Sequence, residues 1–196
     1  MCNEIIAVSN RKMCKKNTFF ECINNVIKDK AKYLILREKD LDIEDYIDLV
    51  CDVKKYMGIS YTKIVLNLGN VRNEEDILKI IEATDCKNIH IPIYIIDKIN
   101  DFRMIRGKVD ILGVPIHSKE EALLAESVGA DYITAGHIFE TDCKKGFPPR
   151  GLDFLRGICK RVNIDVYGIG GINRNNANDV IKAGAKGICI MSGYFK

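Results

Sequence analysis

The sequence contains no apolar run near the roughly 18 residues that a membrane-spanning helix needs. Its N-terminus reads Met-Cys-Asn-Glu, without the positive charge and the long apolar stretch that begin a signal peptide. These two absences predict a cytoplasmic protein with no membrane contact.

The cysteines and the charges give no support to two further kinds of site. Eight cysteines are present, but none forms a Cys-x-x-Cys pair and no Cys/His group has metal-ligand spacing, so no metal site is predicted. The net charge is only +3, and no basic block stands out from the acidic residues around it. A nucleic-acid partner is therefore not expected.

No linker or low-complexity tract interrupts the 196 residues, so a single domain over residues 1–196 is predicted. Most of its strand-like runs are continuously apolar and rich in Ile and Val. This pattern is typical of parallel strands that are covered on both faces. The eight runs begin near Ile5, Tyr33, Lys63, Asn88, Asp110, Tyr132, Asp165 and Gly187.

Helical segments are expected between these runs. Asp42 is placed to cap a helix whose apolar residues recur at i, i+3 and i+4 spacing, and Ser118 with Glu121 forms a capping box. Gly129 and Gly184 each stand between a helical segment and a strand, where glycine supplies the left-handed residue that ends a helix.

Eight strands that alternate with helices predict an α/β fold, the (β/α)8 or TIM barrel. A doubly wound open sheet is the alternative, but it usually has a glycine-rich turn after its first strand, and Ser9-Asn10-Arg11 provides none. No helical segment follows the eighth strand, so the barrel is expected to lack its final C-terminal helix. Uncovered parallel strands are unfavourable, and we therefore predict a homo-oligomer, with a dimer as the expected form.

In a barrel, functional groups lie at the carboxyl ends of the strands. Glycines at 168, 170 and 171 follow the seventh strand, and Ser192-Gly193 follows the eighth. The loops after these two strands are the usual phosphate site of such barrels, because glycines let backbone amides converge on an oxyanion. The alternative is that these glycines only form tight turns.

Two other groups of residues are candidates for chemistry. His137 opens a polar loop after the sixth strand, and its ordinary pKa suits proton transfer near neutrality; alternatively, it only hydrogen-bonds the backbone of its own loop. Arg37 and Lys39 point to the same side of a strand end, either toward an anionic substrate or toward acids of a neighbouring loop. His117 could be structural or substrate-binding, and Lys144 could reach a carboxylate or a phosphate.

Six motifs are spread over nearly the whole chain. They are Leu36-Arg37-Glu38-Lys39, Gly113-Val114-Pro115-Ile116-His117-Ser118, Ala130-Asp131-Tyr132, the stretch 136–146 (Gly-His-Ile-Phe-Glu-Thr-Asp-Cys-Lys-Lys-Gly), Gly168-Ile169-Gly170-Gly171-Ile172 and Ile190-Met191-Ser192-Gly193. Together they resemble the thiamin phosphate synthase/TenI superfamily of (β/α)8 barrels. The stretch 136–146 is most similar to the TenI branch, the thiazole tautomerases.

The resemblance implies different chemistry for the two branches. Synthases join a pyrimidine pyrophosphate to a thiazole phosphate with Mg²⁺, using an acid after the strand-three asparagine and another in the strand-four loop. Here those places hold Leu68 and the run 92–94, Pro-Ile-Tyr. A synthase also typically has a proline at the position of His137, and its Thr-x-Thr-Lys motif is changed here to Thr-Asp-Cys-Lys, with Cys143 in place of the second threonine.

These departures predict a thiazole tautomerase of thiamin biosynthesis, an isomerase that aromatises a carboxylated dihydrothiazole phosphate with no cofactor and no metal. The resemblance then implies that His137 is the acid/base group. Two alternatives stay open, a Mg²⁺-dependent synthase and a non-catalytic barrel that binds thiazole or thiamin phosphate. The expected substrate-binding residues are Arg37, Lys39, Asn67, His117, Thr141 and Lys144, and the expected phosphate-binding residues are Gly170, Gly171, Ser192 and Gly193.

Overall fold

The computed structural model describes residues 4–14, 18–141 and 144–196. Eight parallel strands pair in chain order and close into one barrel, because β1 pairs with β8 as well as with β2. The closed barrel confirms the predicted fold class and excludes the open sheet. The strands are β1 (Glu4–Val8), β2 (Tyr33–Leu36), β3 (Lys63–Asn67), β4 (Asn88–His90), β5 (Ile111–Ile116), β6 (Tyr132–Gly136), β7 (Asp165–Ile169) and β8 (Gly187–Ile190).

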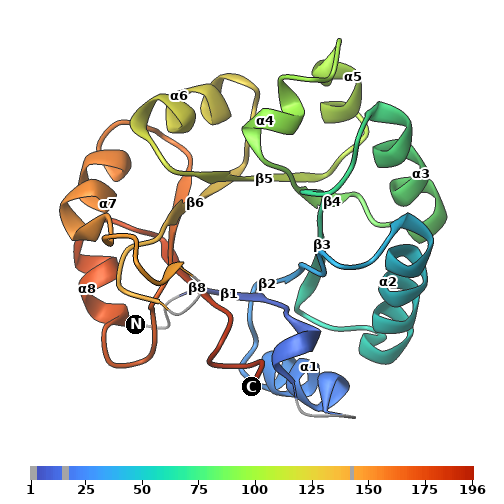
Figure 1. Cartoon of the computed structure of the whole chain (residues 1–196), viewed down its shortest axis with the longest axis horizontal. Coiled ribbons are helices and arrows are strands. Elements are labelled where there is room, and N and C mark those ends of the chain that lie inside the picture. The colour runs from blue at the N-terminus through green and yellow to red at the C-terminus, as the bar shows by residue number, and fades with distance from the viewer. Residues whose placement is uncertain (1–3, 15–17, 142–143) are drawn as a thin grey trace.

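The helices form a ring around the strands (Figure 1). Two short helices follow β4, and the first of them contains Ile93 and Tyr94, which were expected to lie in a loop. No helix in the described ranges has the length and apolar character of a membrane span. The helices are η1 (Arg11–Met13, 3₁₀), α1 (Phe19–Lys28), α2 (Ile43–Met57), α3 (Glu74–Thr84), α4 (Ile93–Ile96), α5 (Phe102–Arg106), α6 (Lys119–Ser127), α7 (Gly151–Cys159) and α8 (Ala177–Lys182).

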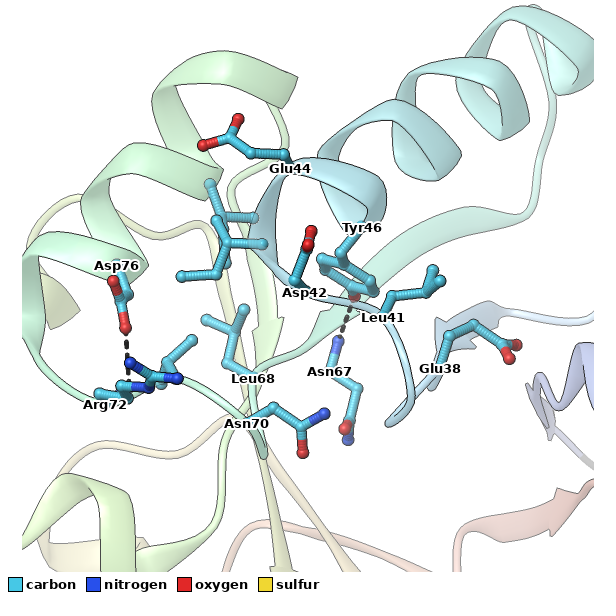
Figure 2. A pocket seen from close by; sticks show the side chains of 13 residues that line it. Glu38, Leu41, Asp42, Glu44, Tyr46, Asn67, Leu68, Asn70, Arg72 and Asp76 are labelled. Carbon is cyan, nitrogen blue, oxygen red and sulfur yellow. Dashed lines mark hydrogen bonds between the residues drawn. The ribbon is translucent and has the colours of Figure 1, made fainter.

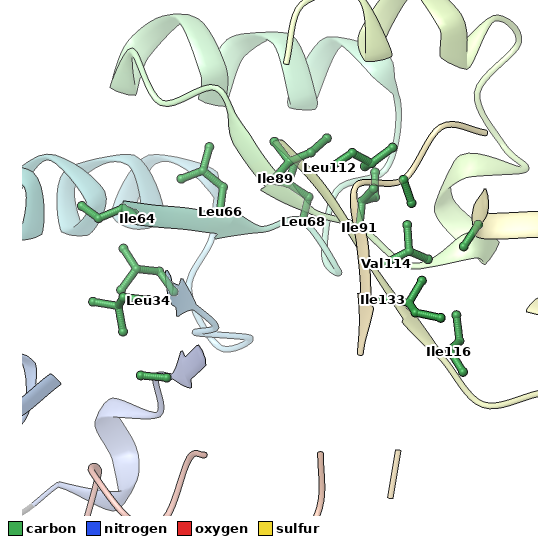
Figure 3. Packing of buried hydrophobic residues seen from close by; sticks show 14 of the residues in the cluster. Leu34, Ile64, Leu66, Leu68, Ile89, Ile91, Leu112, Val114, Ile116 and Ile133 are labelled. Carbon is green, nitrogen blue, oxygen red and sulfur yellow. The ribbon is translucent and has the colours of Figure 1, made fainter. Parts of the chain in front are cut away.

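Continuously apolar strands bury both of their faces, as the sequence predicts. Along β2, Tyr33 and Ile35 belong to the small cluster inside the barrel, whereas Leu34 and Leu36 belong to the larger cluster between strands and helices. Figure 3 shows part of this outer layer, where Leu34 and residues of neighbouring strands pack beneath the helices. The inner cluster is Ile6, Val8, Tyr33, Ile35, Val65, Tyr132, Tyr167 and Cys189.

Predicted helix ends are present in the structure. The side chain of Asp42 accepts a hydrogen bond from the Asp45 backbone at 2.9 Å and caps α2, and Ser118 caps α6 by accepting from the Glu121 N–H at 3.0 Å. Gly184 follows α8 with a φ of +106°, the left-handed conformation that glycine adopts without strain.

After β8 the chain continues through residues 191–196, all of which are described and none of which is helical. Phe195 is fully buried in this segment, and its ring packs on Phe19 of α1 with centroids 5.8 Å apart. The segment therefore lies beside α1 and covers part of the seam between β1 and β8 (Figure 1). The homo-oligomer stays a prediction.

Candidate active site at the barrel mouth

The residues predicted to bind substrate lie on loops at the carboxyl ends of the strands, which meet at one mouth of the barrel. Arg37 and Lys39 follow β2, Asn67 ends β3, His117 follows β5, His137, Thr141 and Lys144 follow β6, Gly170 and Gly171 follow β7, and Ser192 and Gly193 follow β8.

Three cations from two different loops come together at this mouth. The pKa of Lys39 is lowered, first because its ammonium group is partly buried and then because Arg37 and Lys144 lie close to it. Within residues 4–14, 18–141 and 144–196, none of the three makes an ion pair. Cations placed this close together are suited to binding a multiply charged anion, because the anion would offset their mutual repulsion.

The acid nearest to these cations in sequence is occupied elsewhere. Glu38 is only 5% exposed. Its carboxylate accepts a hydrogen bond from the Ser9 hydroxyl at 2.6 Å and another from the Arg11 backbone at 3.0 Å. Burial raises the pKa of Glu38, while these hydrogen bonds act in the opposite direction. Glu38 therefore stabilises the β1 loop and does not neutralise Arg37 or Lys39.

Both histidines at the mouth are held by backbone carbonyls around the β6 loop. His117 Nδ1 donates to the Gly136 carbonyl at 3.1 Å, and His137 Nε2 donates to the Phe147 carbonyl at 3.4 Å. The hydrogen bond of His137 lies within its own loop. This is the contact expected if His137 only holds the backbone of that loop. Its ring is half-buried, and the residue keeps its place at the mouth as a candidate substrate contact.

His90 lies inside the barrel below the mouth. Its Nε2 is 3.4 Å from the Thr134 hydroxyl, and its Nδ1 has no hydrogen-bond partner among the described residues. Burial, with the charge of Arg37 as a second cause, lowers the pKa of His90 to about 3. The imidazole is therefore neutral at physiological pH, which lets the Arg37 cation lie nearby.

The protein is expected to lose stability as pH falls from 6.5 toward 3. In that range His90 binds a proton in the unfolded chain but not in the folded one, so acid favours unfolding. The gap between the two pKa values corresponds to up to about 5 kcal/mol of unfolding free energy. Urea denaturation at pH 6.5, 5.5 and 4.5 measures the effect.

His90→Gln is expected to remove most of this pH dependence, and His117→Gln is the matched control because His117 is exposed at the mouth. Equal slopes of unfolding free energy against pH for wild type and His90→Gln would contradict the assignment.

The glycines after β7 bring two loops into backbone contact. Gly170 and Gly171 have φ values of +99° and +65°. A Cβ on Gly170 would lie 2.4 Å from the Cβ of His137, and one on Gly171 would lie 2.2 Å from the Glu140 carbonyl oxygen. The carbonyl of Gly170 also accepts from the Phe139 N–H at 3.0 Å. These positions thus need glycine for close approach as well as for conformation.

Ser192 and Gly193 lie in the exposed turn after β8. Because β7 and β8 are hydrogen-bonded neighbours, this turn lies next to the glycines of the β7 loop. In the β6 loop the Thr141 carbonyl accepts from the Lys144 N–H at 2.9 Å. Cys143, the position of the altered motif, lies outside the described residues.

A cavity of about 500 Å³ opens beside the mouth, between the β2–α2 and β3–α3 segments (Figure 2). Glu38 and Asn67 line it from the strand ends, and Tyr46 lines it from α2. The apolar periodicity of α2 predicts Tyr46 as a core residue, and it is only 6% exposed. The sequence pattern gives no signal that its hydroxyl reaches the strand ends.

The residues present do not provide the carboxylates that a synthase is expected to use for Mg²⁺. Leu68 is 1% exposed and packs in the outer core. Pro92 is the N-cap of α4 and Ile93 is its first residue, and the Tyr94 hydroxyl donates to the Gly69 carbonyl at 2.9 Å. Over the part of the chain that the structure describes, no three His, Cys, Asp or Glu side chains cluster as a metal site.

Comparisons with known proteins agree with one another. A family model described as thiamine monophosphate synthase matches residues 5–194. Proteins named thiamine-phosphate synthase from Clostridium acetobutylicum and Caldanaerobacter subterraneus are 34% and 31% identical, each over 97% of this chain and 86% of the relative. The solved structure of thiamine phosphate pyrophosphorylase from Pyrococcus furiosus superposes with a TM-score of 0.77 at 24% identity, covering 97% of this chain and 86% of that one.

These relatives contradict three expectations. The prediction of a thiazole tautomerase, and with it of an isomerase, is wrong, because the relatives at 30% identity or more carry the name of a synthase, which is a transferase. The expectation that no cofactor is needed is wrong as well, since it followed from the tautomerase and the synthase alternative uses Mg²⁺.

Proposed function

Because this chain belongs to the thiamine monophosphate synthase family, we propose that it joins a pyrimidine pyrophosphate to a thiazole phosphate and releases pyrophosphate. Relatives that share about a third of their residues over nearly the whole chain carry the synthase name. The described residues do not supply the carboxylates expected to bind Mg²⁺. The roles assigned below are therefore roles of the protein's own side chains and backbone, and none of them is a role of the metal.

The group of three unpaired cations carries the proposal. Coupling forms a bond from the thiazole ring nitrogen to the methylene carbon on the pyrimidine and breaks the bond from that carbon to the pyrophosphate oxygen. The electron pair of the broken bond stays on that oxygen, so negative charge develops on the leaving pyrophosphate. Arg37, Lys39 and Lys144 supply positive charge at one place, and none of them pairs with a carboxylate of residues 4–14, 18–141 or 144–196. Preorganised charge of this kind stabilises a developing anion more than it stabilises the bound substrate.

We place the thiazole phosphate next to the three cations, at the loops that follow β7 and β8. Gly170 and Gly171 present backbone without side chains beside the turn at Ser192 and Gly193, which suits a phosphate ester. In this reaction the ring nitrogen of the thiazole carries no proton, so coupling requires no proton transfer there.

We therefore assign substrate contact, and not acid/base catalysis, to His137. The substrate-contacting set also contains Asn67, His117 and Thr141, whose elements end at the same mouth.

The test is the formation of thiamin phosphate from both substrates in the presence of Mg²⁺. Lys144→Ala is expected to weaken pyrophosphate binding about 10- to 100-fold, since hydrogen bonds to charged groups contribute about 1.5–3 kcal/mol. Lys145→Ala is the matched control, because Lys145 is exposed, lies next to Lys144 in the chain and is not assigned to the site. Binding of thiazole phosphate by calorimetry with no coupled product would instead favour the non-catalytic barrel.

A further inference from the structure

Side chains from other elements bind both polar atoms of the peptide unit that joins Leu36 to Arg37. The Leu36 carbonyl accepts a hydrogen bond from the Tyr46 hydroxyl at 2.8 Å. On the other side of the same unit, the Arg37 N–H donates to the Ser9 hydroxyl at 2.9 Å. A peptide unit is planar, so two contacts on opposite sides fix the direction in which the chain leaves β2 and enters the mouth.

Each of these side chains is buried and makes a second contact. Tyr46 also accepts from the Asn67 N–H at 2.9 Å, which joins the ends of β2 and β3 (Figure 2). Ser9 is 0% exposed, and its hydroxyl donates to the Glu38 carboxylate at 2.6 Å. A chain of hydrogen bonds thus runs from β1, past the backbone of Arg37, to the end of β3.

The group held in this way is the arginine of the three-cation site. We propose that Tyr46 and Ser9 are positioning residues for Arg37, which set the direction of its side chain toward the pyrophosphate. The inference rests on the proposed function for the identity of the anion. Neither hydroxyl is free to contact substrate, because each already bonds on both sides; their effect reaches the anion through Arg37. A small displacement of a charge-stabilising group is enough to lower a rate substantially.

Tyr46→Phe tests this assignment, because it keeps the ring and removes only the hydroxyl. Tyr167→Phe is the matched control. Tyr167 is also buried, and its hydroxyl bonds to Glu4 and Lys32 at the opposite end of the barrel, where β1 and β2 begin. Each variant is compared with wild type by thermal unfolding, by calorimetric titration with inorganic pyrophosphate and by the kcat and KM of thiamin phosphate formation.

Both variants are expected to lower the unfolding temperature. Tyr46→Phe removes the side-chain partner of the Leu36 carbonyl and the Asn67 N–H. Tyr167→Phe removes one hydrogen bond from each member of the Glu4–Lys32 pair, and the two members still bond to each other at 2.8 Å. Only Tyr46→Phe is expected to weaken pyrophosphate binding, by about tenfold or more, and to lower kcat. Ser9→Ala should act in the same direction. In an Arg37→Ala background, Tyr46→Phe should cause no further loss of pyrophosphate affinity, because a residue that acts through Arg37 has nothing left to position.

Three results would overturn the inference. They are a wild type that binds no pyrophosphate, equal pyrophosphate affinity for Tyr46→Phe and Tyr167→Phe, and a full additional loss from Tyr46→Phe when Arg37 is already removed. Failure of the proposed function is a different result. If pyrophosphate binding follows the expected pattern but no thiamin phosphate forms, the positioning role stands and the synthase assignment fails.

Discussion

Arg37→Ala is expected to slow thiamin phosphate formation by about 10²–10³-fold, the usual effect of removing one group that stabilises developing negative charge. The reason is that Arg37 is one of only three cations assigned to the leaving pyrophosphate, and its direction is fixed by buried hydrogen bonds on both sides of its peptide. The fall should appear mainly in kcat, because the charge on the leaving oxygen is largest in the transition state.

Two further variants make this result specific. Arg37→Lys keeps the charge but loses the planar fork that grips two phosphate oxygens, so it should recover part of the lost rate. Arg103→Ala is the control, since that side chain is 95% exposed and pairs with Asp101 on its own helix end. A rate for Arg37→Ala within threefold of wild type would remove the main support for the anion site.

Gly171→Ala is expected to lower the free energy of unfolding by about 2–5 kcal/mol, from overpacking together with left-handed strain. A Cβ at this position would lie 2.2 Å from the Glu140 carbonyl oxygen and 2.8 Å from the Cβ of Phe139. The added methyl group would separate the β6 and β7 loops and disturb the proposed phosphate site between them. Urea denaturation measures the stability, and calorimetry with thiazole phosphate measures the site.

Gly58→Ala separates the two causes. Gly58 also has a positive φ of +52°, but no described atom lies within 4 Å of the place its Cβ would take. Its loss should therefore be limited to conformational strain, about 1–3 kcal/mol, with thiazole phosphate binding unchanged. If the two variants lose equal stability, close approach of the loops is not what makes glycine necessary at 171.

The sequence was sufficient to predict the barrel because its strands carry an unusually clear signal. Apolar residues run continuously through segments such as β2 (Tyr-Leu-Ile-Leu), a pattern that is typical of parallel strands buried on both faces. The caps at Asp42 and Ser118 are local, so side chain and target lie within one turn of each other. By contrast, the split of the β4–β5 connection into α4 and α5 depends on how an apolar segment packs against β5 and α6, which periodicity does not reveal.

The sequence was enough to predict which residues lie at the mouth, but not which of them lie close to one another. The rule that strand ends carry function identifies Arg37, Lys39 and Lys144 separately. That Lys144 approaches Lys39 is a property of barrel closure, because the two residues are more than 100 positions apart in the chain. The direction of the Tyr46 hydroxyl likewise depends on how α2 docks on the strand ends.

The function was mispredicted because a few loop positions received more weight than the whole chain. Leu68 and the run 92–94 in place of the Mg²⁺ acids, His137 in place of a proline and Cys143 in place of a threonine favoured the tautomerase branch. Loops on a rigid scaffold vary more than the elements that they connect, so a few substitutions at strand ends and in loops are weak evidence for a change of reaction. Identity of 34% over 97% of the chain is the stronger observation.

The most direct test of the synthase assignment is a single-turnover reaction that quantifies both products. Enzyme in excess is mixed with the pyrimidine pyrophosphate, saturating thiazole phosphate and Mg²⁺, and the mixture is quenched over time. The assignment predicts that thiamin phosphate and pyrophosphate appear at the same rate and in equal amounts. Bound thiazole phosphate with neither product formed would contradict it.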